Sequence, residues 1–368
     1  MIVVRVLVFA VGMVGVVTTF SSAIRTVVVP RSESLLLQRI VFTAVRVAML
    51  PVQRIMRSDP VRQERLMAYY APFGLIALAI TWIALITLAF TPMYWAIGVD
   101  SWREATRISG SSVTTLGFAA TGADWSGTVL SVVEAVIGLI LVALLISFLP
   151  TMYAEFSQRE QTVAYMAVRA GTPPSGVAML ERFHRIEAVD ELDEIWVRFE
   201  AFFNELSETH TSFLALPFFR SPNPARSWLT TSGAVLDAAA LRMSVVDVPA
   251  EPRCALAIRA GYSALREIAF AYGFVIPADP EPTDPISVTR AEFDDAVAQM
   301  RDTGIPIVAD LDQAWADFSG WRVNYDLPLI AIAGLVSAPP APWSSDRTLP
   351  VRRPILGSML MRDHLDRA

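Results

Sequence analysis

Long apolar runs dominate the first 150 residues of the chain. Each of three runs exceeds twenty residues and holds at most two charged side chains: residues 2–29, 71–98 and 126–149. A helix needs about 20 apolar residues to cross the hydrocarbon core of a bilayer, and a backbone in lipid must satisfy its own hydrogen bonds. The pattern therefore predicts three transmembrane helices.

The pattern changes after Pro150, where apolar residues recur three and four positions apart among charged ones. Ile195, Phe199 and Phe202 show this spacing, which places them on one face of an amphipathic helix. On this basis we predict helices over residues 153–169, 175–187, 190–207, 228–246, 252–274, 290–303 and 310–321. We expect an all-α membrane protein with a helical domain after its last transmembrane helix.

Composition supports this division. The chain of 368 residues is 54% hydrophobic and 18% charged, against about 25% charged residues in soluble domains, and its mean hydropathy is +0.45. These values exclude a disordered chain, and a single cysteine, Cys254, excludes a disulfide scaffold. Residues 1–150 hold eleven Arg and seven acidic residues, whereas the remainder holds nineteen Arg and twenty-nine acidic residues. The domain boundary is therefore predicted near residue 150.

The basic residues predict the orientation of the helices. Residues 25–65 hold eight Arg and three acidic residues, and Arg-rich loops stay on the cytoplasmic side of a membrane. We expect a multi-pass protein of the cell (inner) membrane, with its N-terminus outside and its C-terminal domain in the cytoplasm. Residues 1–23 also have the features of a secretory signal that ends at Ser21, Ser22 and Ala23, but its cleavage would leave the basic loop outside.

An amphipathic helix is expected over residues 34–56 of the basic loop. Arg39, Arg46 and Arg54 are spaced seven or eight residues apart and share one helical face. A helix lying on the inner leaflet would let these side chains bind anionic lipids. Packing of the helix on the cytosolic domain is the alternative that the sequence leaves open.

Residues 99–125 connect the second and third transmembrane helices. Asp100 or Ser101 can cap a short helix that has Glu104 in its first turn, and a stretch of Ser, Thr, Gly and Ala follows. Such a stretch between two membrane helices is typical of a re-entrant loop. Its irregular backbone is tolerated at membrane depth only where protein or a water-filled pore covers it.

This loop contains a run that resembles the selectivity filter of potassium channels, Thr114-Thr115-Leu116-Gly117-Phe118. The family's pattern is T-T-x-G-Y/F-G-D, and its carbonyl and threonine oxygens replace the water around an ion. The order of elements also resembles that family, with a transmembrane helix, a short pore helix, the filter and a final transmembrane helix. The resemblance covers about residues 70–150.

The resemblance implies a channel subunit that conducts potassium or another monovalent cation, with the residues from Thr114 to Phe118 as its ion-binding residues. One filter loop per chain implies a homotetramer, because the family's filter is a ring of four loops. Gly138 lies twenty-one residues after Gly117, at the place of the family's hinge glycine, and is a candidate gating hinge. No enzymatic activity, cofactor, metal site or nucleic-acid partner is expected.

The run departs from the family pattern next to the filter. Ala119 and Ala120 stand where the second glycine and the acidic residue are expected. Because a left-handed backbone is strained for Ala, the outermost ion site is expected to be altered or absent. Ser111 stands where an acidic residue of the pore helix normally braces the filter, and it is a candidate pore-supporting residue.

Glu134 lies in the third apolar run and is a second candidate pore-supporting residue. An ionisable side chain inside a membrane is a functional candidate by default, and it could brace the filter from behind. The alternative is that its side chain reaches the outer interface.

The acidic half of the chain contains no motif of a nucleotide-binding or hydrolytic enzyme. Four acidic residues begin the helix expected at Asp190, and they are interpreted as a solvated first turn rather than a calcium site because the spacing of a calcium loop is missing. His184, His210 and His364 are too scattered for a metal site. A loop-like joint is expected over residues 209–222, without an assigned role.

The chain is thus divided into seven segments. These are a transmembrane anchor (1–29), an Arg-rich cytoplasmic segment (30–70), a pore module (71–150), a cytosolic helical domain (151–276), a linker rich in Pro and acidic residues (277–289), a small helical part (290–337) and a mobile tail (338–368). The cytosolic domain would gate or tether the pore. The alternative is a non-conducting, membrane-anchored interaction or sensor protein that retains a channel-like fold.

Overall fold

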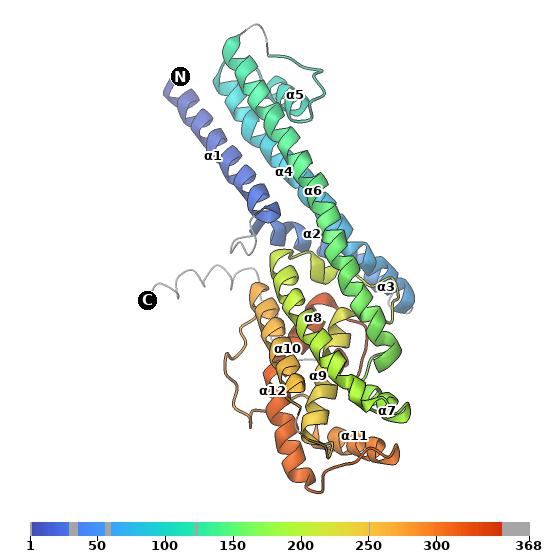
Figure 1. Cartoon of the computed structure of the whole chain (residues 1–368). Helices are drawn as coiled ribbons and strands as arrows, with labels where there is room; N and C mark the ends of the chain where they lie inside the picture. Colours follow the sequence, from blue (N-terminus) through green and yellow to red (C-terminus); the bar gives the residue numbers. More distant parts are fainter. Residues whose placement is uncertain (1, 29–35, 56–59, 122–123, 250, 348–368) are drawn as a thin grey trace. The chain divides into compact units, whose positions relative to one another are not determined.

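The computed structural model describes residues 2–28, 36–55, 60–121, 124–249 and 251–347, except for the side chains of residues 53, 54, 60, 61, 63 and 64. Within these ranges the elements are helices, and an isolated antiparallel bridge joins Val246 and Ile307 (Figure 1). The predicted all-α fold is confirmed. The chain divides into two compact units, Met1–Ala154 and Glu155–Ala368.

Six helices occur in the described part of the first unit. They are α1 (Ile2–Val27), α2 (Leu36–Ile55), α3 (Pro60–Ala68), α4 (Tyr70–Ala96), α5 (Trp102–Val113) and the first part of α6 (Trp125–Ala170). Three helical stretches are long and apolar enough to cross a membrane: Ile2–Val27, Arg65–Ala96 and Trp125–Ala170. They cover most of the three predicted transmembrane runs: the first two stretches end two residues before the predicted runs do, and the third contains its run completely.

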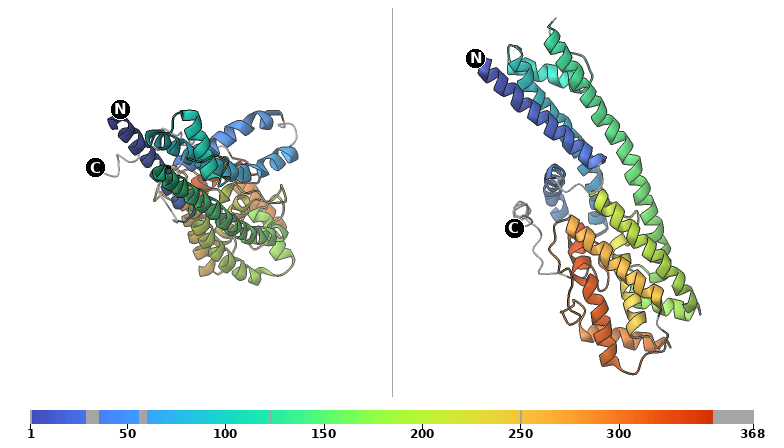
Figure 2. Two further views of the ribbon diagram at one scale, coloured as in Figure 1. Left: turned by 90° about the horizontal axis from the view of Figure 1, so that it is seen from above. Right: turned by 60° about the vertical axis from the view of Figure 1, so that its left-hand side comes forward.

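Helix α1 packs closely along α4, as two views show (Figures 1 and 2). A Cβ atom at Gly12 would lie 2.6 Å from the carbonyl oxygen of Ala89, and Val16 and Ala23 are buried. Small residues allow such an approach of two helices where lipid gives no hydrophobic driving force. The contact favours an uncleaved anchor over a cleaved signal, because cleavage would remove part of this core.

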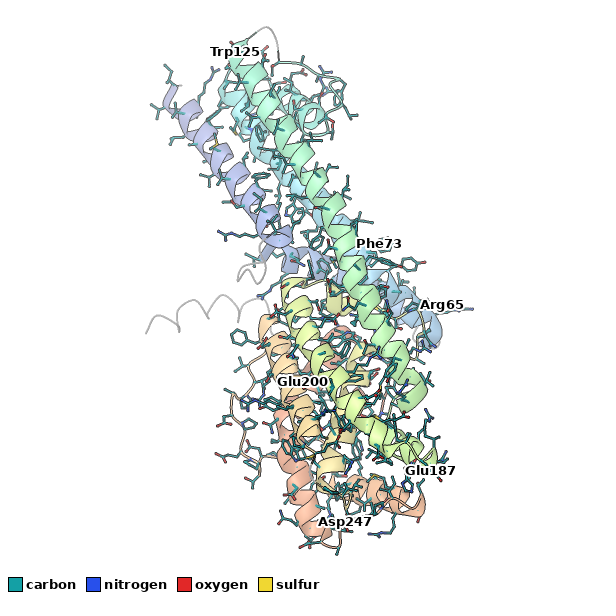
Figure 3. All side chains as sticks on the ribbon, in the orientation of Figure 1. Arg65, Phe73, Trp125, Glu187, Glu200 and Asp247 are labelled. Carbon is teal, nitrogen blue, oxygen red and sulfur yellow. The ribbon has the colours of Figure 1, made fainter. Side chains whose placement is uncertain are left out.

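The outer surfaces of these helices are apolar (Figure 3). Val11 is 71% exposed, Phe73 51% and Trp125, at the start of α6, 78%. Soluble proteins rarely expose contiguous apolar surface of this kind. Such a surface suits helices that are surrounded by lipid.

The second unit holds the end of α6 and six further helices in its described part. They are α7 (Gly176–Arg185), α8 (Leu192–Ser212), α9 (Trp228–Ser244), α10 (Pro252–Ala271), α11 (Arg290–Asp302) and α12 (Leu311–Val336), with 3-10 turns η1 (Val189–Glu191) and η2 (Leu216–Phe218). Every residue of α9 from Trp228 to Leu241 is buried. Helix α9 is therefore the centre of this unit, and α7, α10 and α12 pack against it.

One core connects the segments of this unit. Phe293 and Phe318, from α11 and α12, belong to the same buried cluster as Trp196 and Phe199 of α8. Residues 290–337, which the linker 277–289 separates in sequence, thus share the core of residues 155–276. The predicted tail is described only as far as residue 347, and His364 lies outside the described residues.

The predicted C-terminal end of the helix over residues 310–321 is wrong, because α12 continues to Val336. Pro328 has no N–H group to donate to the carbonyl oxygen of Asn324, four residues earlier. The Nε atom of Arg266 donates to that oxygen at 3.1 Å instead. Replacement of the missing hydrogen bond explains why the helix continues through a residue that usually ends one.

The N-terminal part of α8 also differs from the prediction. Residues 189–191 form the turn η1, and α8 begins at Leu192 without a side-chain cap, so the expected cap at Asp190 is wrong. At its other end α8 continues to Ser212, so the predicted loop-like joint starts later than residue 209. Buried residues of α8, such as Leu206 and His210, extend its packed face by one turn and account for the longer helix.

Candidate functional site

The short helix α5 and the segment after it form the candidate site in the first unit. Ser101 caps α5, and its side chain accepts a hydrogen bond from the Glu104 backbone N–H at 3.1 Å. The buried residues Ala105 and Ile108 attach α5 to the apolar core of the unit. Local capping and apolar packing together fix this helix between α4 and α6.

Ser111 anchors the segment that follows α5. Its carbonyl oxygen accepts hydrogen bonds from the N–H groups of Leu116 (3.1 Å) and Gly117 (3.4 Å). Its hydroxyl accepts from the N–H of Ala119 at 3.0 Å, and the residue is 1% exposed. The sequence-predicted supporting residue therefore lies behind the filter-like run, where it binds the backbone of three residues.

The backbone of the filter-like run has an unusual conformation. Thr115 has a φ angle of 58° and Gly117 of 69°, whereas Leu116 between them is not left-handed. The left-handed conformation costs an ordinary residue about 1–2 kcal/mol. A backbone that alternates between the two hands can turn successive carbonyl groups to one side. In the isolated chain these residues are exposed, with Leu116 at 71% and Phe118 at 58%.

Glu134 is the centre of a buried hydroxyl cluster, which we define as Glu134, Tyr94, Ser109, Ser112 and Ser131. The Tyr94 hydroxyl donates to one Glu134 carboxylate oxygen at 2.8 Å and the Ser109 hydroxyl to the other at 2.5 Å. Ser131 and Ser112 lie 3.1 and 3.5 Å from the Tyr94 hydroxyl.

Through this cluster Glu134 joins α4, α5 and α6. The residue is 0% exposed, so its side chain does not reach the outer interface as one interpretation of the sequence allowed. Through Ser109, Glu134 holds α5, the helix that directly precedes the filter-like run.

Gly138 lies at a close contact between α6 and the end of α5. A Cβ atom at this position would lie 2.1 Å from the carbonyl oxygen of Val113. The glycine is therefore needed for packing, and α6 is continuous through it. Its role as a gating hinge stays a prediction.

The Arg-rich helix α2 packs on α4 within the first unit. The Phe42 and Tyr70 rings meet edge to face at 5.8 Å, and the Tyr70 hydroxyl donates to the Phe42 carbonyl oxygen at 3.2 Å. Arg39 and Arg46 are half-buried. The side chain of Arg54 lies outside the described residues, and lipid binding by these arginines stays a prediction.

The second unit contains an ionic cluster that the sequence did not reveal. We define this arginine cluster as Arg322, Asp237, Tyr325, Asp326 and Ser287. The Arg322 guanidinium donates to Asp237 and, at 2.7 Å, to Asp326. The Tyr325 hydroxyl donates to Asp237 at 2.9 Å, and the Ser287 hydroxyl to Asp326 at 2.7 Å.

The burial of this cluster governs its electrostatics. Burial raises the pKa of the Asp237 carboxyl, and the nearby Arg322 guanidinium offsets part of that effect. A sequence signal did exist, because Asp237 interrupts an apolar helix and Arg322 and Asp326 lie four residues apart in another. Their partners are distant in sequence, so the signal could not show that they meet.

A second buried cation, Arg159, lies near the end of α6. It donates to the carbonyl oxygens of Leu216 (3.0 Å) and Phe219 (2.8 Å), and its Nη1 atom lies 3.3 Å from Nε2 of His210. Burial, together with the Arg159 charge, holds the pKa of His210 well below its usual range. His210 is therefore neutral at pH 7 and supports α6 within the second unit.

Among the residues that the structure describes, no three His, Cys, Asp or Glu side chains gather in a way that could hold a metal ion. Known proteins offer no further guide to the site. No family model, no curated protein and no solved structure matches this chain.

Proposed function

We propose that this chain is one subunit of a membrane cation channel, in which the residues from Thr114 to Phe118 line the ion path. The proposal rests mainly on the filter-like run, which is anchored on Ser111 and left-handed at Thr115 and Gly117. It follows a short helix that lies between two helices long enough to cross a membrane. Carbonyl and threonine oxygens in such a segment suit a dehydrated monovalent cation such as potassium.

Four copies of the chain would complete the pore. A single exposed run of five residues cannot surround an ion, whereas a ring of four loops can. The re-entrant segment would then be covered by neighbouring chains, as irregular backbone at membrane depth requires. Ala119 in place of a second glycine favours selectivity for monovalent cations in general over strict selectivity for potassium.

The orientation follows from the charges. The Arg-rich residues 25–65 favour the cytoplasmic side, which puts the N-terminus and the α5 segment on the outer side. The second unit would then lie in the cytoplasm of a cell whose plasma membrane holds the channel. Helix α6 belongs to both units, so it is the element through which the second unit would gate or tether the pore.

Cation flux into liposomes that contain the purified chain tests this function. Gly117→Val is the decisive variant, because a β-branched residue is strained at a φ of 69° although no atom lies within 4 Å of its Cβ position. The strain of about 1–2 kcal/mol or more should lower the flux about tenfold or more.

Gly110→Val is the matched control. Gly110 also has nothing within 4 Å of its Cβ position, but it lies inside α5 and has no left-handed backbone. Its flux should stay within about threefold of the wild type, because Val is at least as favourable as Gly inside a helix. Equal flux in the two variants, or no flux in the wild type, would contradict the channel proposal and favour a non-conducting, membrane-anchored protein.

A further inference from the structure

A cavity of about 290 Å³ lies in the second unit, between the start of α7, the middle of α9, α11 and the segment that follows α12. Three of its lining residues are acidic, Asp237, Glu292 and Asp295, and none of the described lining residues is basic. The remaining lining includes Trp343 and small or apolar residues such as Ala296 and Val177. The cavity therefore combines negative charge with an aromatic and aliphatic wall.

Asp237 contributes a buried carboxylate to this cavity that is only partly satisfied. The residue is 2% exposed. Its Oδ1 atom accepts hydrogen bonds from Arg322 and Tyr325, whereas Oδ2 accepts none from any residue that the structure describes. Oδ2 is not among the fully buried side-chain atoms without a partner, and its residue lines the cavity. A carboxylate oxygen that can be reached from a cavity can accept a hydrogen bond from a ligand there.

The charges around the cavity do not balance. Arg322 is shared by Asp237 and Asp326, and Arg347 is shared by Glu292 and Asp346. Asp295 forms no ion pair with the described residues. Among the described residues, two guanidinium groups thus balance five carboxylates, and the excess negative charge favours a cationic ligand.

The chemistry of the wall selects the kind of cation. A metal ion needs several ligands at short range, and no three suitable side chains gather among the described residues. An ammonium group, in contrast, donates up to three hydrogen bonds and is attracted to the face of an indole ring such as Trp343. Its carbon chain can contact Ala296 and Val177.

We propose that this cavity binds a small organic ammonium compound, with its ammonium group donating to Oδ2 of Asp237. The inference concerns the second unit alone and does not depend on ion conduction. Glu292 is held by Arg347 and by Thr289, at 2.8 Å from the Thr289 backbone N–H. Asp295 is therefore the carboxylate at the cavity entrance that remains for the ligand.

Isothermal titration calorimetry on the full chain in detergent tests the proposal with butylammonium chloride as the probe. We expect saturable binding of butylammonium and no saturable binding of 1-butanol, which has the same carbon chain without the charge. Titration of sodium chloride to the same ionic strength should give only the heat of dilution. Saturable binding of both organic probes would show that the cavity binds the carbon chain without need of the charge, and would contradict a site for ammonium compounds.

Two neighbouring surface variants locate the site. Asp295→Lys puts a cation at the cavity entrance and should weaken butylammonium binding about tenfold or more. Asp294→Lys makes the same charge change one residue earlier on α11, outside the cavity lining, and should keep the affinity within about threefold. Both positions are exposed, so both variants should fold.

A third variant, Asp237→Asn, removes the charge at the base of the cavity and should abolish binding. If it fails to fold, the pair of lysine variants decides alone. Equal affinities of Asp295→Lys and Asp294→Lys, or no saturable binding to the wild type, would contradict the proposal.

Discussion

The two units bury their polar side chains in different ways. In the hydroxyl cluster of the first unit, Glu134 accepts hydrogen bonds from neutral hydroxyl groups. In the arginine cluster of the second, two carboxylates share one guanidinium that is 0% exposed. A neutral donor costs far less to bury alone than an ion does.

This difference in buried charge predicts different consequences when one member of each cluster is removed. Removal of one member of the hydroxyl cluster loosens the support of one short helix. Removal of the guanidinium leaves two uncompensated charges in the core around α9. We therefore expect the first cluster to control function with small effects on stability, and the second to control stability.

The largest effect is expected for Arg322→Ala. It leaves Asp237 and Asp326 buried without their partner, which should lower the free energy of unfolding by about 3–5 kcal/mol. In a unit of this size that corresponds to a fall of about 2–4 °C in Tm for each kcal/mol. Thermal unfolding of the purified chain, followed by circular dichroism, measures it.

Arg253→Ala provides the comparison for that measurement. Arg253 pairs with Asp193 at 3.4 Å, but the two side chains are 57% and 45% exposed. An exposed pair contributes about 0–1 kcal/mol, so Tm should hardly change. Similar shifts in the two variants would mean that the arginine cluster does not hold the unit together.

An intermediate effect, on function, is expected at Glu134. Glu134→Leu removes both carboxylate acceptors, but the Tyr94 hydroxyl keeps Ser131 at 3.1 Å and the Ser109 hydroxyl keeps the Thr87 carbonyl oxygen at 3.2 Å, so stability should fall by only about 1 kcal/mol. Because α5 loses its support, liposome cation flux should fall about tenfold or more. Glu134→Gln keeps an acceptor oxygen and should retain more flux than Glu134→Leu.

Val133→Leu serves as the neighbouring control, since Val133 is 47% exposed on the same helix. It should conduct like the wild type. Loss of flux in Val133→Leu, or full flux in Glu134→Leu, would argue against a supporting role of the hydroxyl cluster.

The smallest effect is a pH dependence at His210. The pKa of His210 is held well below its usual range by burial and by Arg159, whereas an unfolded His titrates near about 6.5. Below that pH the unfolded chain binds a proton that the folded unit does not. The folded state therefore loses up to about 1.4 kcal/mol for each further pH unit of acidification, until the folded pKa is reached.

His210→Gln removes this contribution. Its Tm should fall less than that of the wild type between pH 7 and pH 5, whereas at pH 8 the two chains differ only by the lost contacts. Parallel Tm curves across this range would show that His210 binds a proton as readily in the folded unit as in the unfolded chain, and would contradict its burial beside Arg159.

Much of the fold could be predicted because its causes are local. The lengths and hydropathy of three runs identified α1, α4 and α6, and Ser101 at the start of α5 was one of two expected caps. Helix α12 was predicted too short. It continues through Pro328, and the donor that replaces the missing hydrogen bond there, Arg266, is far away in sequence.

The candidate site was predictable in its residues but not in its geometry. Ser111 was predicted to support the filter-like run because of its place in the preceding helix, and Glu134 because it is an ionisable residue in the following apolar run. The contacts of Ser111 with Ala119, of Glu134 with Tyr94, and of Gly138 with Val113 depend on tertiary packing. The arginine cluster was missed for the same reason, since Asp237 and Arg322 are eighty-five residues apart.

Recording from the purified chain in a planar bilayer tests the central claim most directly. With a potassium chloride gradient across the membrane, we expect discrete unitary currents whose reversal potential has the sign of a cation-selective pore. These currents should be lost in Gly117→Val but not in Gly110→Val. Bilayers that contain folded wild-type chain yet show no unitary current, or a current without cation preference, would contradict it.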